Sequence, residues 1–157
     1  MTSCKARFAA DWLLMSMPKH VTEQMIHYRI VPIDPAAHLF EVELAIAQAN
    51  PEGQQLKLPA WIPGSYMIRD FARHIVQIEA FRLPPGKTKV GSRAAVVPLH
   101  KLDKHTWQLP KAAAGGVLVR YQVYAWDLSV RGAHLDETHG FSNGTSVFLA
   151  VVGQTDA

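Results

Sequence analysis

Hydrophobic and polar residues alternate with a period of two along two long segments of the chain. In residues 38–47 the apolar face holds Phe40, Val42, Leu44 and Ile46, and Glu41 and Glu43 lie between them. Residues 117–125 repeat the pattern, with Val117, Val119, Tyr121 and Val123 at every second position. Period-two alternation is typical of strands that bury one face. The pattern therefore predicts two half-buried antiparallel strands.

Shorter strand-like segments fill most of the remaining chain. They are separated by Pro, Gly, Asn and Asp, and they comprise residues 26–33, 55–60, 74–82, 96–101, 106–109 and 145–152. The segments 96–101 and 106–109 are expected to form a hairpin around Asp103-Lys104. In the segment 74–82, Val76, Ile78 and Ala80 are expected to share one face, and residues 112–116 are expected to form a loop of small residues. Residues 66–73 are either one helical turn or an irregular strand. Short strands with almost no helix predict an all-β fold, an antiparallel β-sandwich or saddle-like open sheet of about eight to ten strands.

Residues 58–71, with the sequence LPAWIPGSYMIRDF, form the most distinctive local stretch. Pro63-Gly64 indicates a tight turn, because proline fixes φ and glycine tolerates positive φ. Three large aromatic residues lie around this turn: Trp61, Tyr66 and Phe71. Such residues are poorly suited to water. Two interpretations stay open, a buried structural corner and a surface that binds another component.

A second distinctive region, residues 127–143, has little periodicity and many polar, Gly and His residues. It is expected to be a loop of about 15 residues, and loops of that length are usually functional or disordered. An ion pair between Asp127 and Arg131 would order it, although a surface pair of this kind contributes little stability. Asn143-Gly144 predicts a positive-φ turn that presents Ser142, Asn143 and Thr145 at the edge of a cleft.

Composition narrows the class of protein. The 157 residues are 48% hydrophobic and 18% charged, which is an ordinary globular balance. The net charge is +3, but Lys and Arg are scattered singly, so no nucleic-acid partner is expected. No apolar run reaches the ~20 residues of a membrane span. The single cysteine, Cys4, fits a reducing compartment, which favours the cytoplasm and leaves export open.

The chain is expected to contain one folded domain. Residues 1–24 are interpreted as a leader or upstream extension, because a strand-like pattern begins at Met25. Residues 25–157 then form the β-domain.

The sequence assigns no metal site and no nucleophile. The His-Glu-x-x-His pattern that places two imidazoles on one helix face does not occur. In a loop, a group of four side chains is still able to converge on a metal ion: His134, Asp136, Glu137 and His139. The alternative is that they form local hydrogen bonds. Gly-x-Ser-x-Gly and glycine-rich phosphate loops are also missing from the sequence.

Two segments together resemble a known family. Residues 58–71 and residues 124–136, the latter continued by residues 140–149, are similar to the N-terminal domain of the glycyl aminopeptidase family of zinc metallopeptidases. The resemblance runs from about Met25 to the end of the sequence. It implies a β-rich domain that packs against a thermolysin-like catalytic domain of the same polypeptide. That catalytic domain would carry His-Glu-x-x-His and the zinc ion. This sequence holds none of those parts, so we expect no cofactor in it and no activity from it alone.

The resemblance also implies roles for particular residues. By analogy with related aminopeptidases, the candidates for facing the peptide substrate are Asp127, Arg131, Ser142, Asn143, Gly144 and Thr145. The candidates for anchoring the interface with the catalytic domain are Trp61, Pro63, Gly64, Tyr66 and Arg69. The alternative function is a free-standing β-sandwich module that binds a ligand or protein through the Trp61 and Trp126 loops.

Overall fold

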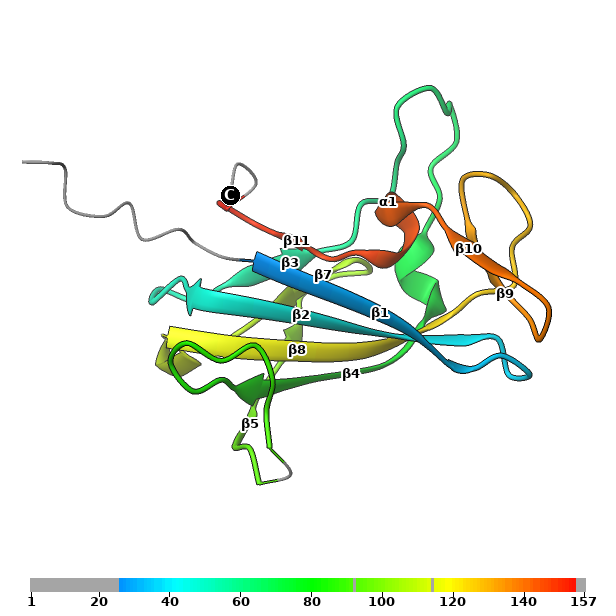
Figure 1. Cartoon of the computed structure of the whole chain (residues 1–157). Coiled ribbons are helices and arrows are strands. Elements are labelled where there is room, and N and C mark those ends of the chain that lie inside the picture. Colours follow the sequence, from blue (N-terminus) through cyan, green and yellow to red (C-terminus); the bar gives the residue numbers. More distant parts are fainter. Residues whose placement is uncertain (1–25, 92, 114, 155–157) are drawn as a thin grey trace, which may run out of the picture.

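The computed structural model describes residues 26–91, 93–113 and 115–154, and strands are the main regular structure in this part of the chain (Figure 1). Its strands are β1 (Ile26–Asp34), β2 (Leu39–Ala49), β3 (Gln55–Lys57), β4 (Ile75–Arg82), β5 (Val96–Val97), β6 (His100–Lys101), β7 (Thr106–Gln108), β8 (Gly115–Tyr124), β9 (Ala133–Leu135), β10 (Gly140–Ser142) and β11 (Ala150–Val151). Its helices are the 3₁₀ turns η1 (Phe71–His74) and η2 (Lys111–Ala113) and the short helix α1 (Gly144–Val147).

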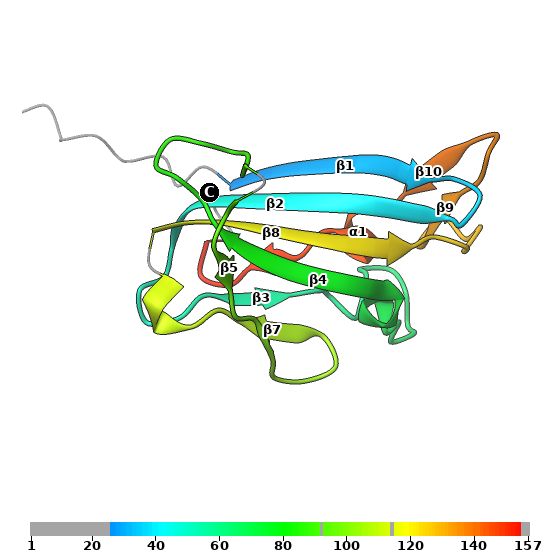
Figure 2. The same cartoon turned by 90° about the horizontal axis from the view of Figure 1, so that it is seen from below.

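The strands form two packed layers and a small hairpin (Figure 2). The larger sheet has the order β1-β2-β8-β4-β5, and the smaller sheet has the order β11-β3-β7-β6. Strands β9 and β10 form a separate two-stranded sheet, and β9 makes one further bridge, between His134 and Trp126. All the strand pairs are antiparallel. The predicted all-β class with antiparallel open sheets is therefore confirmed, with eleven strands in the described residues because several are only two or three residues long.

The core lies between the two layers. In the larger sheet, β2 and β8 pair so that Val42 faces Tyr121 and Leu44 faces Val119, and all four are buried. The smaller sheet contributes Leu56, Trp107 and Val151 to the same cluster. The apolar faces predicted from the alternation of β2 and β8 are confirmed, because each strand buries its regular series of hydrophobic residues.

The opposite face of the larger sheet carries charge. Glu43 lies on this face, as the alternation predicts, but it is almost fully buried. Its carboxylate accepts hydrogen bonds from Arg29 at 3.2 Å and Arg120 at 2.9 Å. The two guanidinium groups satisfy the carboxylate that the sheet shields from water.

Four details differ from the expected strands. Residues 96–101 do not form one strand, because Pro98 separates β5, which pairs with β4, from β6, which pairs with β7. The predicted strand 55–60 ends at Lys57, shortly before Pro59. A register shift between Ile75 and Gln77 leaves Val76 exposed instead of facing inward. Gly115-Gly116, expected in a loop, begins β8.

The last third of the chain differs most from the expectation. The predicted long loop 127–143 contains the β9–β10 hairpin, and the predicted strand 145–152 contains α1 and only two strand residues. At the junction of α1 and β11, the hydroxyl of Tyr121 donates to the carbonyl of Val147 at 2.8 Å and accepts from the Leu149 N–H at 3.1 Å. A buried side chain thus satisfies backbone groups that a strand would have paired with a neighbour.

The interpretation of residues 1–24 as a leader lies outside the described residues. Across the ranges that are described, no helix combines the length and the apolar composition needed to cross a membrane.

Candidate functional site

Three segments that the sequence singled out meet at one end of the molecule. They are the loop 58–71, the loop 127–132 and the segment 140–147, and Figures 1 and 2 both place them at this end. The Asn143 N–H donates to the carbonyl of Gly132 at 2.9 Å, which joins the second and third segments. Helix α1 contacts η1, which begins at Phe71, the last residue of the first segment.

The loop 58–71 is an ordered turn. The Arg69 N–H donates to the Ala60 carbonyl at 2.7 Å and closes the base of the loop. At its tip, the Trp61 indole N–H donates to the Ser65 carbonyl at 2.6 Å. Gly64 has a φ of +81°, so the predicted positive-φ turn at Pro63-Gly64 is confirmed.

The large side chains of this loop point into solvent. Trp61 is 52% exposed, and Tyr66, Met67 and Ile68 are also exposed, whereas Phe71 is buried. The interpretation as a buried corner is therefore right for Phe71 and wrong for Trp61 and Tyr66. The Nε of Arg69 is buried and has no hydrogen-bond partner among the described residues.

The loop 127–132 is organised by Asp127. Its Oδ1 accepts from the Ser129 N–H at 2.8 Å, and its own N–H donates to the Ala133 carbonyl at 2.9 Å. A Cβ at Gly132 would lie 2.4 Å from Asp127 Oδ2, so the loop closes only with glycine there. The predicted pair with Arg131 is wrong: the carboxylate is used by the local turn, and Arg131 is exposed with no ion-pair partner in the described part of the chain.

A small cavity lies where these segments meet. It has a volume of about 10 Å³, and its polar lining comes from His74, Asp127 and Ser146. This volume suits a single water molecule. Burial lowers the pKa of His74, Arg73 lowers it further, and Asp127 partly offsets the effect. The cavity is therefore a small gap left where the loops pack together, and it is too small for a peptide substrate.

The segment around Asn143 differs from the predicted turn. Asn143 has a φ of −84° and caps α1, where its Oδ1 accepts from the Thr145 N–H at 3.0 Å. Asparagine is among the best N-cap residues, and this role replaces the positive-φ turn. Ser142 and Gly144 are exposed, while Asn143 and Thr145 are half-buried. The segment lies beside the Asp127 loop as expected, and whether it faces a substrate cleft stays a prediction.

A series of rings crosses the base of the β9–β10 hairpin. The Trp126 ring lies between His38, at a centroid distance of 4.0 Å, and His134, at 4.9 Å. On its far side, His134 meets His139 at 5.0 Å and Phe141 at 5.9 Å. His134 is 2% exposed, so its orientation is fixed by these neighbours.

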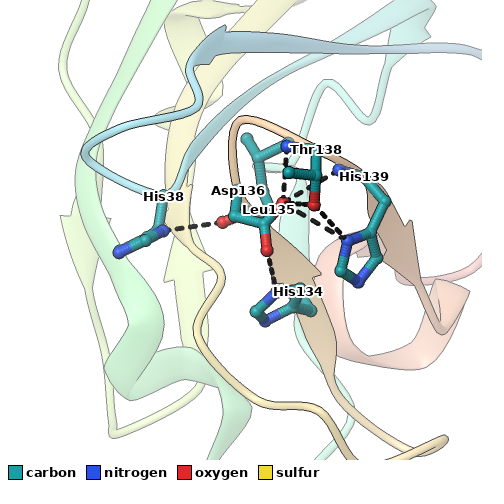
Figure 3. Close-up of polar contacts among 6 residues, drawn as sticks. All are labelled: His38, His134, Leu135, Asp136, Thr138 and His139. Carbon is teal, nitrogen blue, oxygen red and sulfur yellow. Dashed lines mark hydrogen bonds and ion pairs between the residues drawn. The ribbon is translucent and has the colours of Figure 1, made fainter.

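Asp136 lies between two histidines at the tip of this hairpin (Figure 3). Its Oδ2 is 3.1 Å from His134 Nε2, and its Oδ1 accepts from the N–H groups of Thr138 and His139. The Thr138 hydroxyl, the His139 backbone N–H and His134 hold the pKa of Asp136 well below its usual range. Three of the four side chains that were possible metal ligands thus meet, and Glu137 does not join them.

Sequence reasoning missed His38. Its Nδ1 donates to the Leu135 carbonyl at 2.7 Å, across 97 residues of sequence, and its backbone has a φ of 60°. No local pattern signals such a long-range contact. This hydrogen bond links the β1–β2 turn to the hairpin that carries Asp136.

Comparison with known proteins gives one family. Residues 27–157 match the model of the peptidase M61 N-terminal domain. The chain is also similar to the crystal structure of an aminopeptidase N family protein from Idiomarina loihiensis, with 51% identity and a TM-score of 0.73, over 84% of this chain and 20% of that one. It therefore spans about a fifth of the length of that solved relative. No curated protein matches. The family match covers most of the chain, and the chain belongs to the peptidase M61 N-terminal domain family.

Proposed function

We propose that this domain is the non-catalytic N-terminal part of a zinc-dependent aminopeptidase similar to the glycyl aminopeptidases. In this proposal it docks on a thermolysin-like catalytic domain of the same polypeptide and shapes the cleft for the peptide substrate. One observation carries the proposal: the loop 58–71 is held in an ordered turn, yet it presents large apolar side chains to solvent.

An ordered apolar loop is suited to docking. Trp61, Tyr66, Met67 and Ile68 are exposed on a short stretch of chain whose base and tip are closed by hydrogen bonds. Contiguous exposed apolar surface marks interaction sites. Since the turn is already fixed, little conformational entropy is lost when a partner covers it.

Arg69 supports the same surface. Its buried Nε has no partner in the described residues, and an unsatisfied buried donor is unfavourable. A carboxylate or carbonyl group of the covering domain would satisfy it. Arg69 then joins the apolar side chains as an interface anchor, with Pro63 and Gly64 setting the shape of the turn.

The cleft role is proposed for the neighbouring segments. Arg131 and Ser142 are exposed beside the docking loop, and they are the candidates for contact with a substrate. Asp127, Asn143 and Thr145 are half-buried and make the hydrogen bonds that shape the two loops. Gly144 lies exposed at the first position of α1.

The residues described here do not fit the zinc site that the resemblance implies. That site needs two histidines and a glutamate on one face of a helix. The single α-helix in the described ranges is the four-residue α1, Gly-Thr-Ser-Val, which offers none of them. No hydrolytic step is therefore assigned to this domain, and in the proposal the catalytic domain supplies the zinc ion.

Two experiments test the proposal. Purified chain is expected to release no amino acid from peptides, with or without added zinc, and zinc-dependent aminopeptidase turnover by it would overturn the proposal. The second experiment reads the genomic DNA after the codon for Ala157. An open frame with His-Glu-x-x-His supports the proposal, and a stop codon there favours the free-standing binding module instead.

Docking is tested by matched substitutions in the full-length reading frame. Ile68→Asp places a charge in the docking loop, and Val96→Asp places one on β5, outside that loop; the two side chains are similarly exposed, at 77% and 71%. Ile68→Asp is expected to separate the thermal unfolding of the two domains and to lower aminopeptidase activity, while Val96→Asp leaves both unchanged. Equal effects of the two variants would contradict docking through this loop.

A further inference from the structure

We propose that the tip of the β9–β10 hairpin binds one divalent transition-metal ion, of the class of Zn²⁺, through His134, Asp136 and His139. Each offers one ligand atom, and these atoms lie within 4.8 Å of one another. Two imidazoles and one carboxylate suit a cation of borderline softness, since calcium and magnesium prefer oxygen ligands alone.

The distances are close to those of a tetrahedral site. Zinc bonds to nitrogen and oxygen of about 2.0–2.2 Å place neighbouring ligand atoms roughly 3.3–3.5 Å apart. His134 Nε2 is 3.1 Å from Asp136 Oδ2, which is close to this spacing. His139 Nδ1 is 3.3 Å from the other carboxylate oxygen, Oδ1, so His139 has to turn toward Oδ2 when an ion binds. The longest separation in the cluster has to shorten on binding, and His139 can rotate to do so because its side chain is 55% exposed.

Two of the three ligands are already oriented. The His134 ring is fixed by Trp126 and Phe141 and is 2% exposed. Asp136 Oδ1 accepts from the Thr138 hydroxyl and from two backbone N–H groups, which leaves Oδ2 directed at His134 alone. The cation would lie between Nε2 and Oδ2, where the structure has a hydrogen bond.

Binding requires both histidines to change tautomer. In the metal-free protein, Nε2 of His134 carries the proton that it donates to the Asp136 carboxylate, and Nδ1 of His139 donates to the Thr138 hydroxyl. When a metal takes these two nitrogens, each ring keeps its proton on the other nitrogen. The His139 side chain is 55% exposed, so water can accept the proton on its second ring nitrogen.

His134 sets the strength of the site. Its Nδ1 is buried without a hydrogen-bond partner, so a proton there finds no acceptor. A hydrogen-bond acceptor for this second nitrogen usually raises metal affinity about 10–100-fold. His134 lacks such an acceptor in the described residues. We therefore expect a dissociation constant on the order of micromolar, with solvent or a docked group completing the coordination.

The experiment titrates the purified chain, without a histidine tag and in a Cys4→Ser background, with Zn²⁺ by calorimetry and with Co²⁺ by visible absorption. Cys4→Ser removes the single thiol, which would otherwise compete for both ions. The expected result is one ion per chain and a Co²⁺ spectrum of low coordination number. His139→Ala is expected to weaken binding at least tenfold, and His100→Ala, which removes an exposed histidine from β6, leaves it unchanged.

A second variant separates folding from binding. Asp136→Asn keeps an oxygen for the turn but removes the charge, and it is expected to weaken Zn²⁺ binding while circular dichroism stays that of the parent chain. Three results would each overturn the proposal: no saturable binding below about 1 mM in the parent chain, wild-type affinity in His139→Ala, or equal losses in His139→Ala and His100→Ala. In that case the cluster acts only as a hydrogen-bonded turn.

Discussion

The indole N–H of Trp61 and the carbonyl oxygen of Ser65 are 2.6 Å apart, and their hydrogen bond spans the Pro63-Gly64 turn. Ser65 is buried beneath the turn, while more than half of the Trp61 side chain remains in solvent. The same residue thus fixes the loop through its polar edge and offers its apolar face to a partner. Its two roles can be separated by substitution.

Trp61→Phe keeps an aromatic ring and removes the donor. We expect it to lower the free energy of unfolding by about 0.5–1.5 kcal/mol, the usual contribution of one hydrogen bond. Met67→Ala is the control, because it changes an exposed side chain of the same loop; it should shift stability by less than about 0.5 kcal/mol. Thermal denaturation of the isolated chain measures both. A Trp61→Phe chain that melts like wild type would show that this bond does not fix the turn.

Tyr121→Phe tests how the segment before β11 is held. The Tyr121 hydroxyl is buried and serves both Val147 and Leu149, so its removal leaves two backbone groups unsatisfied. We expect a loss of about 2–3 kcal/mol in unfolding free energy. Tyr28→Phe removes a hydroxyl that donates only to the Leu149 carbonyl, from a more exposed ring, and should cost about 1 kcal/mol or less. Urea denaturation compares them, and equal losses would contradict the double role of Tyr121.

Gly132→Ala tests the closure of the Asp127 loop. The new Cβ would lie 2.4 Å from Oδ2 and 2.8 Å from Cβ of Asp127, so the loop has to move. We expect a destabilisation of about 1–3 kcal/mol, as for other overpacked sites. Gly91→Ala is the matched control, since its Cβ meets no atom within 4 Å and its φ is not positive. If both variants unfold at the same denaturant concentration, the close approach is not a constraint.

Acid should weaken the β9–β10 hairpin through Asp136. The pKa of this carboxyl is lower in the folded chain than the unfolded value of about 3.9, because Thr138, His139 and His134 donate to the charged form. Its contribution is therefore present above about pH 4 and is lost as the pH falls further. Asp136→Asn should be less stable than wild type at pH 6, and the difference should shrink toward pH 2. Denaturant unfolding at a series of pH values measures this, with Glu137→Gln as the control for a lost charge.

The long strands could be predicted because their information is local. Hydrophobic residues alternate around Val42 and Leu44 in β2 and around Val119 and Tyr121 in β8. This alternation predicts which face of each strand is buried, even when the neighbouring strands are unknown. The turn at Gly64 is equally local, since its residue type matches its positive φ. The antiparallel open sandwich follows from many such segments without helices between them.

The structure of residues 127–152 could not be predicted from local patterns of this kind. Residues 145–152 have the composition of a strand, but Asn143 caps a helix there and Tyr121 binds the backbone that follows. The β9–β10 hairpin has three-residue strands, too short to show a period. The contact between His38 and Leu135 depends on the pairing of distant strands, which no window of sequence contains.

Strand β11 has a consequence for the time course of folding. It pairs with β3, so that Ala150 lies opposite Lys57 and Val151 opposite Leu56. During synthesis, β3 leaves the ribosome about ninety residues before its partner, and one of its edges has no partner in the meantime. The hairpin of β1 and β2 can form early, but the smaller sheet can be completed only after residue 151 has emerged. A nascent chain stalled before that point would present an open edge to chaperones and to other chains.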